Sequence, residues 1–237
     1  MFQNCVVTGA TSGIGMAIAL ALSGSGVKLG LIGRDSGQLE AVAAEARIRS
    51  ADVEQYQLDL QSGDDIRKVA SEIGKRFEGV DVLVHSAGVF RMAPLADAPT
   101  SDLDLLYRTN VRAPYQLTQA LLPMLIARKG QIVFINSSVG LTARAGVGAY
   151  AATKHALKAI ADSLRAEVNE LGVRVISVYP GRTATPQQQR ICQQEQRPYQ
   201  PDRLLQPEDV ARAVLNALAM PRTAEVTDIQ IRPMLKS

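Results

Sequence analysis

Short apolar runs alternate with amphipathic segments along the whole chain, and this alternation restricts the fold more than any other feature of the sequence. The segment from Gly148 to Leu171 carries apolar residues three and four positions apart and is followed by Gly172, the pattern of a helix with a C-terminal glycine. The run 131–135 contains Ile-Val-Phe-Ile, as expected of a strand covered on both faces. Because strands that alternate with helices pair in parallel through right-handed crossovers, the sequence predicts an α/β fold: a doubly wound parallel sheet of about seven strands with helices on both faces. The predicted strands are 4–8, 27–32, 55–58, 80–84, 131–135, 173–179 and 226–231, and the predicted helices are 14–22, 35–46, 64–77, 102–128, 148–171 and 207–218.

The length of 237 residues predicts one domain over 1–237, because an ordinary domain holds roughly 100 to 200 residues. The charged fraction of 21% excludes disorder, and the net charge of +3 is too small and too scattered to indicate a nucleic-acid or membrane partner. The first 27 residues carry no charge, but Thr, Ser and Gly interrupt them, so we expect neither a signal peptide nor a membrane span. Cys5 and Cys192 fit neither a disulfide framework nor a metal site, which favours a reducing cytoplasm.

Two segments interrupt the regular pattern. The helix over 102–128 contains Pro114 and Pro123, so we expect it to be kinked or split. The segment 182–206 is polar, and its stretch 186–201 holds seven Gln. We interpret 182–206 as a mobile, solvated loop. It belongs to the single domain and covers the substrate.

A glycine-rich loop, Thr8-Gly9-Ala10-Thr11-Ser12-Gly13-Ile14-Gly15, joins the first predicted strand to the first predicted helix. In a doubly wound fold this connection is where a dinucleotide binds. Glycines let the backbone approach a pyrophosphate, and the helix N-terminus offers N–H groups and a partial positive charge. A glycine-rich turn that binds nothing is the alternative reading of the loop alone.

Three other residues supply chemistry. Tyr150 and Lys154 are four positions apart, so one helical turn brings the ammonium near the phenol. A nearby cation is expected to lower the pKa of the phenol and to make it a usable acid or base. Ser137, at the end of the fifth predicted strand, could place its hydroxyl beside Tyr150 and hydrogen-bond a substrate oxygen.

Together these motifs resemble the short-chain dehydrogenase/reductase family, whose members have the Rossmann fold, over essentially the whole chain. The resemblance implies that Tyr150 exchanges a proton with the substrate oxygen, Ser137 orients that oxygen, and Lys154 holds the nicotinamide ribose. It also implies that Asn110 anchors a water that relays protons. The matching residues are Thr8, Gly9, Gly13, Gly15, Asp59, Ala87, Gly88, Asn110, Ser137, Tyr150, Lys154, Pro180, Gly181 and Thr183. The predicted cofactor contacts are Gly9, Thr11, Ser12, Gly13, Ile14, Gly15, Arg34, Asp59, Leu60, Ser86, Ala87, Gly88, Tyr150, Lys154, Pro180, Gly181 and Thr183.

The chain departs from the family pattern in two places. The usual Asn-Asn-Ala-Gly reads His85-Ser86-Ala87-Gly88, so the Asn amide that ties this loop to its neighbours is missing. We interpret His85 as a buried structural histidine. The C-terminal segment 227–233 lacks the frequent Asp-Gly-Gly ending, which weakens any identification with acyl-carrier ketoreductases.

The end of the second predicted strand indicates the cofactor. An acidic residue there would bind the adenosine ribose diol, but this chain has Gly33 and then Arg34, which could pair with a 2′-phosphate. We therefore predict that NADP(H) is preferred over NAD(H). The alternative is that Arg34 only caps the strand and pairs with Asp35.

The substrate is less defined. One hypothesis is that Arg182 or Arg190 favours anionic substrates, and Phe90, Met92, Leu141 and Tyr199 are candidates to face the substrate. The prediction is an NADP(H)-dependent oxidoreductase acting on a small-molecule carbonyl or secondary alcohol, without metal, nucleic acid or membrane. A homodimer or homotetramer is expected from the resemblance. The alternatives are a non-catalytic dinucleotide-binding regulator or redox sensor of the same fold and, less favoured on length, a sugar-nucleotide epimerase.

Overall fold

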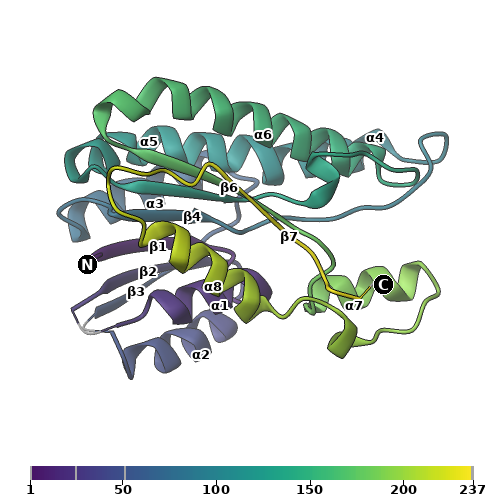
Figure 1. Cartoon of the computed structure of the whole chain (residues 1–237), viewed down its shortest axis with the longest axis horizontal. Coiled ribbons are helices and arrows are strands. Elements are labelled where there is room, and N and C mark those ends of the chain that lie inside the picture. Colours follow the sequence, from purple (N-terminus) through teal and green to yellow (C-terminus); the bar gives the residue numbers. More distant parts are fainter. Residues whose placement is uncertain (1, 25, 51, 236–237) are drawn as a thin grey trace.

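The computed structural model, which describes residues 2–24, 26–50 and 52–235, contains one seven-stranded parallel sheet. The strand order is β3-β2-β1-β4-β5-β6-β7, and the helices lie on both sides of it (Figure 1). The fold class predicted from the alternation is therefore confirmed. The strands are β1 Asn4–Thr8, β2 Lys28–Gly33, β3 Asp52–Gln57, β4 Val82–His85, β5 Gln131–Ile135, β6 Arg174–Pro180 and β7 Asp228–Ile231.

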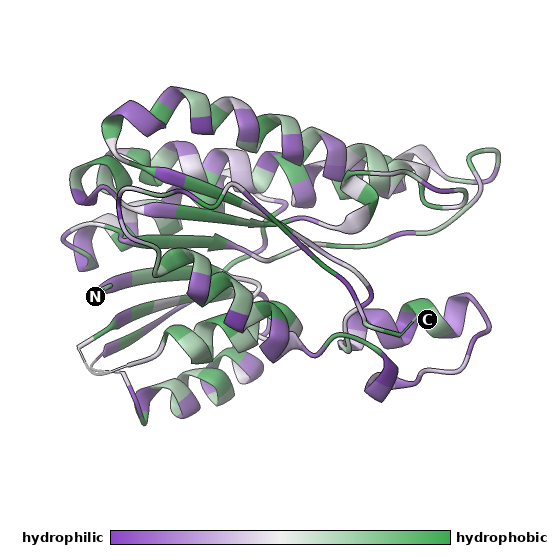
Figure 2. Ribbon diagram, in the orientation of Figure 1, coloured by the Kyte–Doolittle hydropathy of each residue, from purple (hydrophilic) through white to green (hydrophobic). Residues whose placement is uncertain are grey.

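The sheet separates two apolar layers. Cys5 and Val7 of β1 point into one layer, with helices α1 (Gly13–Leu22), α2 (Ser36–Arg47) and α8 (Pro207–Leu218). Val6 points into the other layer, with α3 (Gly63–Arg76), α5 (Ala113–Arg128) and α6 (Gly148–Val168). Successive side chains of a strand point to opposite faces, so a sheet covered on both sides requires the uninterrupted apolar runs seen in the sequence. Figure 2 shows the central strands as largely hydrophobic.

The helical region that contains two prolines is divided by a π-helical turn, where we expected a kink or a split. Helix α4 (Thr100–Tyr107) continues into a π-helical turn at Arg108–Arg112, and α5 follows. Pro114 lies directly after the π-helical turn, and Pro123 lies inside α5 without ending it. Tyr107, Arg112 and Ala113 all keep right-handed helical dihedrals, so the irregularity beside Pro114 is a π-helical turn within one helical path.

The polar segment 182–206 was predicted as a loop, and this prediction is wrong for its first half. Helix α7 occupies Pro186–Gln194, and a 3₁₀ turn occupies Pro201–Arg203. The Thr185 hydroxyl accepts a hydrogen bond from the Gln188 N–H at 3.1 Å, and Pro186 opens the helix, so a capped N-terminus offsets the poor apolar content. Figures 1 and 2 show α7 as a hydrophilic helix beyond the carboxyl ends of the strands.

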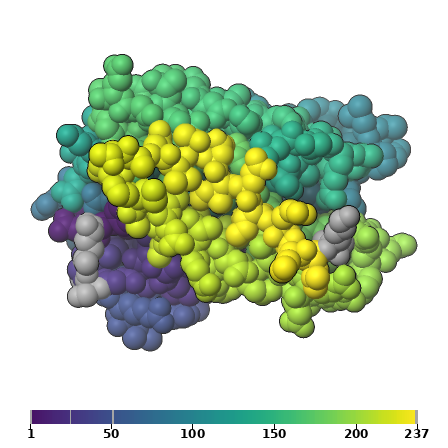
Figure 3. All heavy atoms as spheres, viewed as in Figure 1, coloured from purple at the N-terminus to yellow at the C-terminus, as the bar shows by residue number. Residues whose placement is uncertain are grey.

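The C-terminal segment leads back to the same end of the sheet. β7 and the residues that follow it run across the surface toward α7 (Figure 3). Gly181 lies so close to this segment that a Cβ atom on it would stand 2.9 Å from Cδ of Pro233. In the described ranges, no helix is both long enough and apolar enough to cross a membrane.

Candidate active site

A crevice opens where the strand order reverses, between β1 and β4. The Thr8 hydroxyl closes the base of this crevice: it accepts hydrogen bonds from the N–H groups of Ser86 (3.1 Å) and Ala87 (3.2 Å) and donates to the Val84 carbonyl (3.3 Å). Gly9 has φ +67°, and a Cβ atom there would lie 2.7 Å from the Ala87 nitrogen, so only glycine fits. Thr8 thus connects the end of β1 to the loop after β4. This is the loop that lacks the family's usual Asn amide.

A cavity of about 900 Å³ extends from this crevice along the carboxyl ends of the strands. Every residue predicted to contact a cofactor lines it, and so does Ser137. Those lining residues are Gly9, Thr11, Ser12, Gly13, Ile14, Gly15, Arg34, Asp59, Leu60, Ser86, Ala87, Gly88, Ser137, Tyr150, Lys154, Pro180, Gly181 and Thr183.

The glycine loop suits a pyrophosphate. The Ser12 side chain makes no capping hydrogen bond at the start of α1, and the first turn contains no acidic residue. The helix N–H groups there are left for a ligand, with the positive end of the helix dipole behind them. Gly15 fits against Gly9 so closely that a Cβ atom on Gly15 would lie 2.2 Å from the Gly9 carbonyl oxygen. These features fit the anionic centre of a dinucleotide.

The end of β2 forms the far wall of the cavity. Arg34 and Asp35 both line it. The Asp35 carboxylate caps α2 by accepting a hydrogen bond from the Gln38 N–H at 2.9 Å, and no ion pair joins it to Arg34 in the described part of the chain. A Cβ atom on Gly33 would lie 2.5 Å from Cγ2 of Thr11, so an acidic residue at position 33 could not be added without displacing Thr11.

Tyr150 and Lys154 lie in the cavity wall, 8% and 4% exposed. The Lys154 ammonium donates to the Ile135 carbonyl at 3.0 Å and lies 5.8 Å from the centre of the Tyr150 ring. Burial raises the pKa of Tyr150 to about 12, against the opposing effect of a hydrogen bond with Ser137. Burial likewise lowers the pKa of Lys154 to about 8. The predicted depression of the Tyr150 pKa is therefore wrong, because the loss of hydration on burial outweighs the hydrogen bond with Ser137.

Two residues that the sequence analysis did not select hold this group in place. The Asn136 carboxamide donates to the Lys154 carbonyl at 3.0 Å and accepts from the Ser137 N–H at 2.9 Å. The Thr153 hydroxyl donates to the Tyr150 carbonyl at 2.8 Å. Both residues are buried, and in the sequence Asn136 directly precedes Ser137 and Thr153 directly precedes Lys154. A polar residue next to a predicted functional residue is the only sequence signal that could have identified them.

Asn110 does not line the cavity. Its carboxamide, in the π-helical turn, accepts from the Val89 N–H at 2.9 Å and donates to the Val89 carbonyl at 3.0 Å and the Thr153 hydroxyl at 3.3 Å. These contacts connect the loop after β4 to α6. The relay of protons through a water at Asn110 stays a prediction.

His85 lies in the core rather than in the cavity. Its Nε2 is 2.8 Å from the Thr118 hydroxyl, and its ring stacks on Phe134 at 5.0 Å. Burial lowers its pKa to about 3, so the ring is neutral at physiological pH. These contacts agree with the structural role expected of His85.

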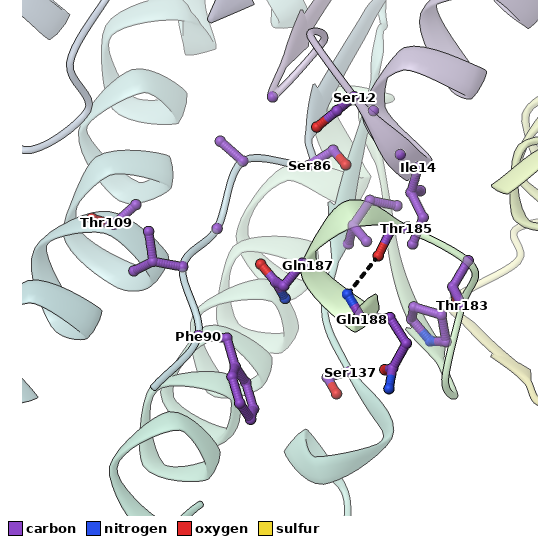
Figure 4. A pocket seen from close by; sticks show the side chains of 18 of the residues that line it. Ser12, Ile14, Ser86, Phe90, Thr109, Ser137, Thr183, Thr185, Gln187 and Gln188 are labelled. Atoms are coloured by element: carbon purple, nitrogen blue, oxygen red, sulfur yellow. Dashed lines mark hydrogen bonds between the residues drawn. The ribbon is translucent and has the colours of Figure 1, made fainter. Parts of the chain in front are cut away.

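The opposite wall is formed by α7 and by the segments after β4 and β5. Of the four candidates to face a substrate, Phe90 and Leu141 line the cavity, whereas Met92 and Tyr199 do not. The Phe90 and Tyr150 rings form a T-shaped contact with their centroids 4.9 Å apart. Figure 4 shows the side chains of this region, with Gln187 and Gln188 of α7 across from Phe90. The cavity residues Thr109, Ser138, Thr142, Arg144, Thr185, Gln187 and Gln188 were not predicted as site residues.

Comparisons with known proteins agree with this geometry. The model of the short chain dehydrogenase family matches residues 3–196. An uncharacterized short-chain type dehydrogenase/reductase of Sinorhizobium fredii is 33% identical over 237 residues, covering 98% of this chain and 92% of that protein. An uncharacterized oxidoreductase of Staphylococcus saprophyticus is 31% identical over 97% of this chain and 96% of its own length.

Solved structures give the same result. The alcohol dehydrogenase of the archaeon Thermococcus sibiricus, complexed with 5-hydroxy-NADP, has a TM-score of 0.90 at 25% identity and covers 100% of this chain and 99% of its own. A metagenomic short-chain oxidoreductase in complex with NADP has a TM-score of 0.84 at 32% identity, with 99% and 98% of the two chains covered. This chain therefore belongs to the short-chain dehydrogenase family of oxidoreductases.

Proposed function

We propose that this protein is an NADP(H)-dependent oxidoreductase that interconverts a carbonyl and a secondary alcohol. The observation that carries the proposal is that Ser137, Tyr150 and Lys154 line the same cavity as the glycine loop. A dinucleotide site and an acid/base group are thus continuous. A regulator that only binds a dinucleotide would need no such acid/base group, so the second candidate function is less favoured.

The protein's own residues align the substrate and move the proton. When bound, a nicotinamide dinucleotide supplies or accepts the hydride. Tyr150, whose pKa burial raises to about 12, is neutral at pH 7 and carries a phenolic proton that it can donate to a carbonyl oxygen. Ser137 would hold the same oxygen by a hydrogen bond, and Lys154 would hold the ribose of the nicotinamide nucleotide.

Arg34 supports the preference for NADP(H). It lines the end of the cavity, and Asp35, its neighbour in sequence, is engaged as a helix cap. A guanidinium in that position can pair with a 2′-phosphate through two hydrogen bonds. The NADP found in the metagenomic relative agrees with this preference. Reduction of neutral ketones should proceed with a higher kcat/KM for NADPH than for NADH, and an equal or higher value for NADH would refute the preference.

The experiment that tests the activity compares wild-type protein with Tyr150→Phe in a screen of carbonyl and alcohol substrates followed by NADPH absorbance. We expect Tyr150→Phe to lower kcat by about 10²- to 10⁴-fold while the Kd for NADPH stays within about twofold. Tyr199→Phe is the control, because Tyr199 lies outside the cavity. Turnover that survives in Tyr150→Phe would contradict the acid/base role, and no turnover with wild-type protein would favour the binding regulator.

We also propose that the protein works as a homo-oligomer in the cytoplasm. Leu103, Tyr107 and Tyr115 of α4 and α5 are 42%, 51% and 52% exposed, and large exposed apolar side chains on neighbouring helices are typical of an interface. Cys5 and Cys192 are free and buried, which agrees with a reducing compartment. Sedimentation equilibrium of the purified protein tests the assembly, and a monomer at micromolar concentration would refute it.

A further inference from the structure

The charged residues that line the cavity are unevenly distributed. Asp35 and Asp59, its acidic residues, follow β2 and β3 at the end near the glycine loop. Arg144, Arg182 and Arg190 lie toward the other end, in the segment after β5, the segment after β6, and α7. Within the described chain, no carboxylate lines the wall that these three arginines share. This end of the cavity therefore favours anions over neutral or cationic groups.

Arg182 is already neutralised. Its Nη2 lies 2.8 Å from Oε1 and 2.7 Å from Oε2 of Glu195, at the C-terminus of α7. The two side chains are 16% and 15% exposed, so the pair is well shielded from water. This ion pair attaches α7 to the end of β6. Arg182 is therefore a residue that positions α7 rather than one that receives a ligand.

Arg144 and Arg190 remain available. The nearest carboxylate to Arg144 is that of Glu195, at 3.9 Å, which is already occupied by Arg182 at a shorter distance. Arg190 forms no ion pair in the part of the chain that the structure describes, although it lines the cavity. Gln187, Arg190 and Ile191 of α7 all line the cavity and are spaced by three and four positions, so they share the helix face that turns toward it.

We propose that Arg144 and Arg190 bind an anionic group, a carboxylate or a phosphate, on the carbonyl compound that this enzyme reduces. The inference rests on the proposed function and names its substrate class. Guanidinium groups recognise both anions through charge-assisted hydrogen bonds. The Arg144 side chain is 48% exposed and Arg190 is also exposed, so both cavity-lining guanidinium groups are accessible to a ligand. The substrate then carries its carbonyl at Tyr150 and its anion beneath α7.

Matched pairs of ligands test this site without requiring turnover. The protein saturated with NADP⁺ cannot reduce a ketone, so calorimetric titration gives a Kd for 4-oxopentanoate and for its methyl ester, and for dihydroxyacetone phosphate and dihydroxyacetone. We expect at least one anion to bind tenfold or more tightly than its neutral partner. The first pair tests whether the site binds a carboxylate, and the second pair tests whether it binds a phosphate. No preference in either pair, or no measurable binding of either anion, overturns the proposal.

The arginine variants locate the site. Arg144→Gln and Arg190→Gln should each weaken the preferred anion by about tenfold or more and leave the neutral partner unchanged. Arg197→Gln removes the same charge from an exposed position outside the cavity, and it should alter neither. An anion preference that persists in Arg144→Gln and Arg190→Gln, or is lost equally in Arg197→Gln, overturns the proposal.

The affinity for NADP⁺ distinguishes this proposal from the main alternative, in which the two arginines bind the cofactor. If the two arginines serve the cofactor phosphates instead, Arg144→Gln and Arg190→Gln will weaken NADP⁺ by as much as they weaken the anionic ligand. We expect the Kd for NADP⁺ to change by less than about threefold. Reduction of neutral ketones by wild-type protein that shows no anion preference would mean that the oxidoreductase function stands and the anion site fails.

Discussion

Asn110 holds both backbone groups of Val89: its Oδ1 accepts from the Val89 N–H at 2.9 Å and its Nδ2 donates to the Val89 carbonyl at 3.0 Å. The same amide reaches the Thr153 hydroxyl, which in turn donates to the Tyr150 carbonyl. The π-helical turn is therefore coupled to the loop beside the cavity and to the helix that carries Tyr150.

Asn110→Leu should destabilise the protein and slow the reaction. The substitution leaves the partly buried Val89 N–H and carbonyl unpaired, at about 1–2 kcal/mol each, so we expect the free energy of unfolding to fall by about 2–4 kcal/mol. Urea denaturation measures this change, and kcat should fall with it because Phe90 follows Val89 in the cavity wall. Asn169→Ala, at an exposed asparagine, is the control and should remain within about 0.5 kcal/mol. Equal stability of Asn110→Leu and wild-type protein would disprove the coupling.

Thr8→Val should weaken the junction between β1 and β4. Valine keeps the shape but leaves the Ser86 and Ala87 N–H groups without their acceptor, and we expect a loss of about 1–3 kcal/mol in the free energy of unfolding. Because that loop lines the cavity, the Kd for NADPH should also rise. Thr223→Val, at an exposed position, controls for the change of side chain. The interpretation fails if Thr8→Val binds NADPH normally and unfolds at the wild-type urea concentration.

The stability of the protein should depend on the titration of Lys154. Its pKa is lowered from 10.5 in the unfolded chain to about 8 in the folded chain, so the unfolded chain binds more protons between these values. The contribution of Lys154 to the free energy of unfolding therefore rises from about pH 8 to about pH 10.5, by about 3 kcal/mol at most.

Other groups also titrate in alkali, so the test uses the difference between wild-type protein and Lys154→Met. We expect wild-type protein to gain stability relative to Lys154→Met across that pH range, as measured by urea denaturation at each pH. Lys75→Met, at an exposed position in α3, should show no such trend. A constant difference between wild type and Lys154→Met from pH 7 to pH 10.5 would contradict the lowered pKa.

Arg34→Glu should change the choice of cofactor. The glutamate repels a 2′-phosphate, so we expect kcat/KM for NADPH to fall by about 10- to 100-fold while kcat/KM for NADH is retained or raised. Steady-state kinetics with a neutral ketone measure both values. Arg49→Glu introduces the same charge at an exposed residue outside the cavity and should affect neither cofactor. An equal loss with both cofactors would mean that Arg34 has no role in selecting between them.

Patterns within single elements of the sequence predicted most of the fold. The apolar run 131–135 became the buried strand β5, and the helical stripe that ends before Gly172 became α6. Such patterns succeed because a strand covered on both faces, or a helix with one buried stripe, leaves a periodic record in the sequence. The bounds were less accurate: β3 begins three residues before its predicted start, since Asp52 continues the ladder opposite Lys28. The loop prediction failed at α7, where a Thr-Pro cap sustains a helix with few apolar residues.

The sequence by itself determined the parallel sheet, the glycine loop at its switch point, and the placement of Ser137, Tyr150 and Lys154 at one end of the strands. Each of these follows from local backbone needs and from the rule that the carboxyl ends of parallel strands meet at one edge. Only the tertiary structure decided that Arg182 is paired with Glu195 while Arg144 faces the cavity. The reason is physical: ion pairs between loops depend on where distant segments meet and on side-chain conformation, and neither leaves a periodic signal in the sequence.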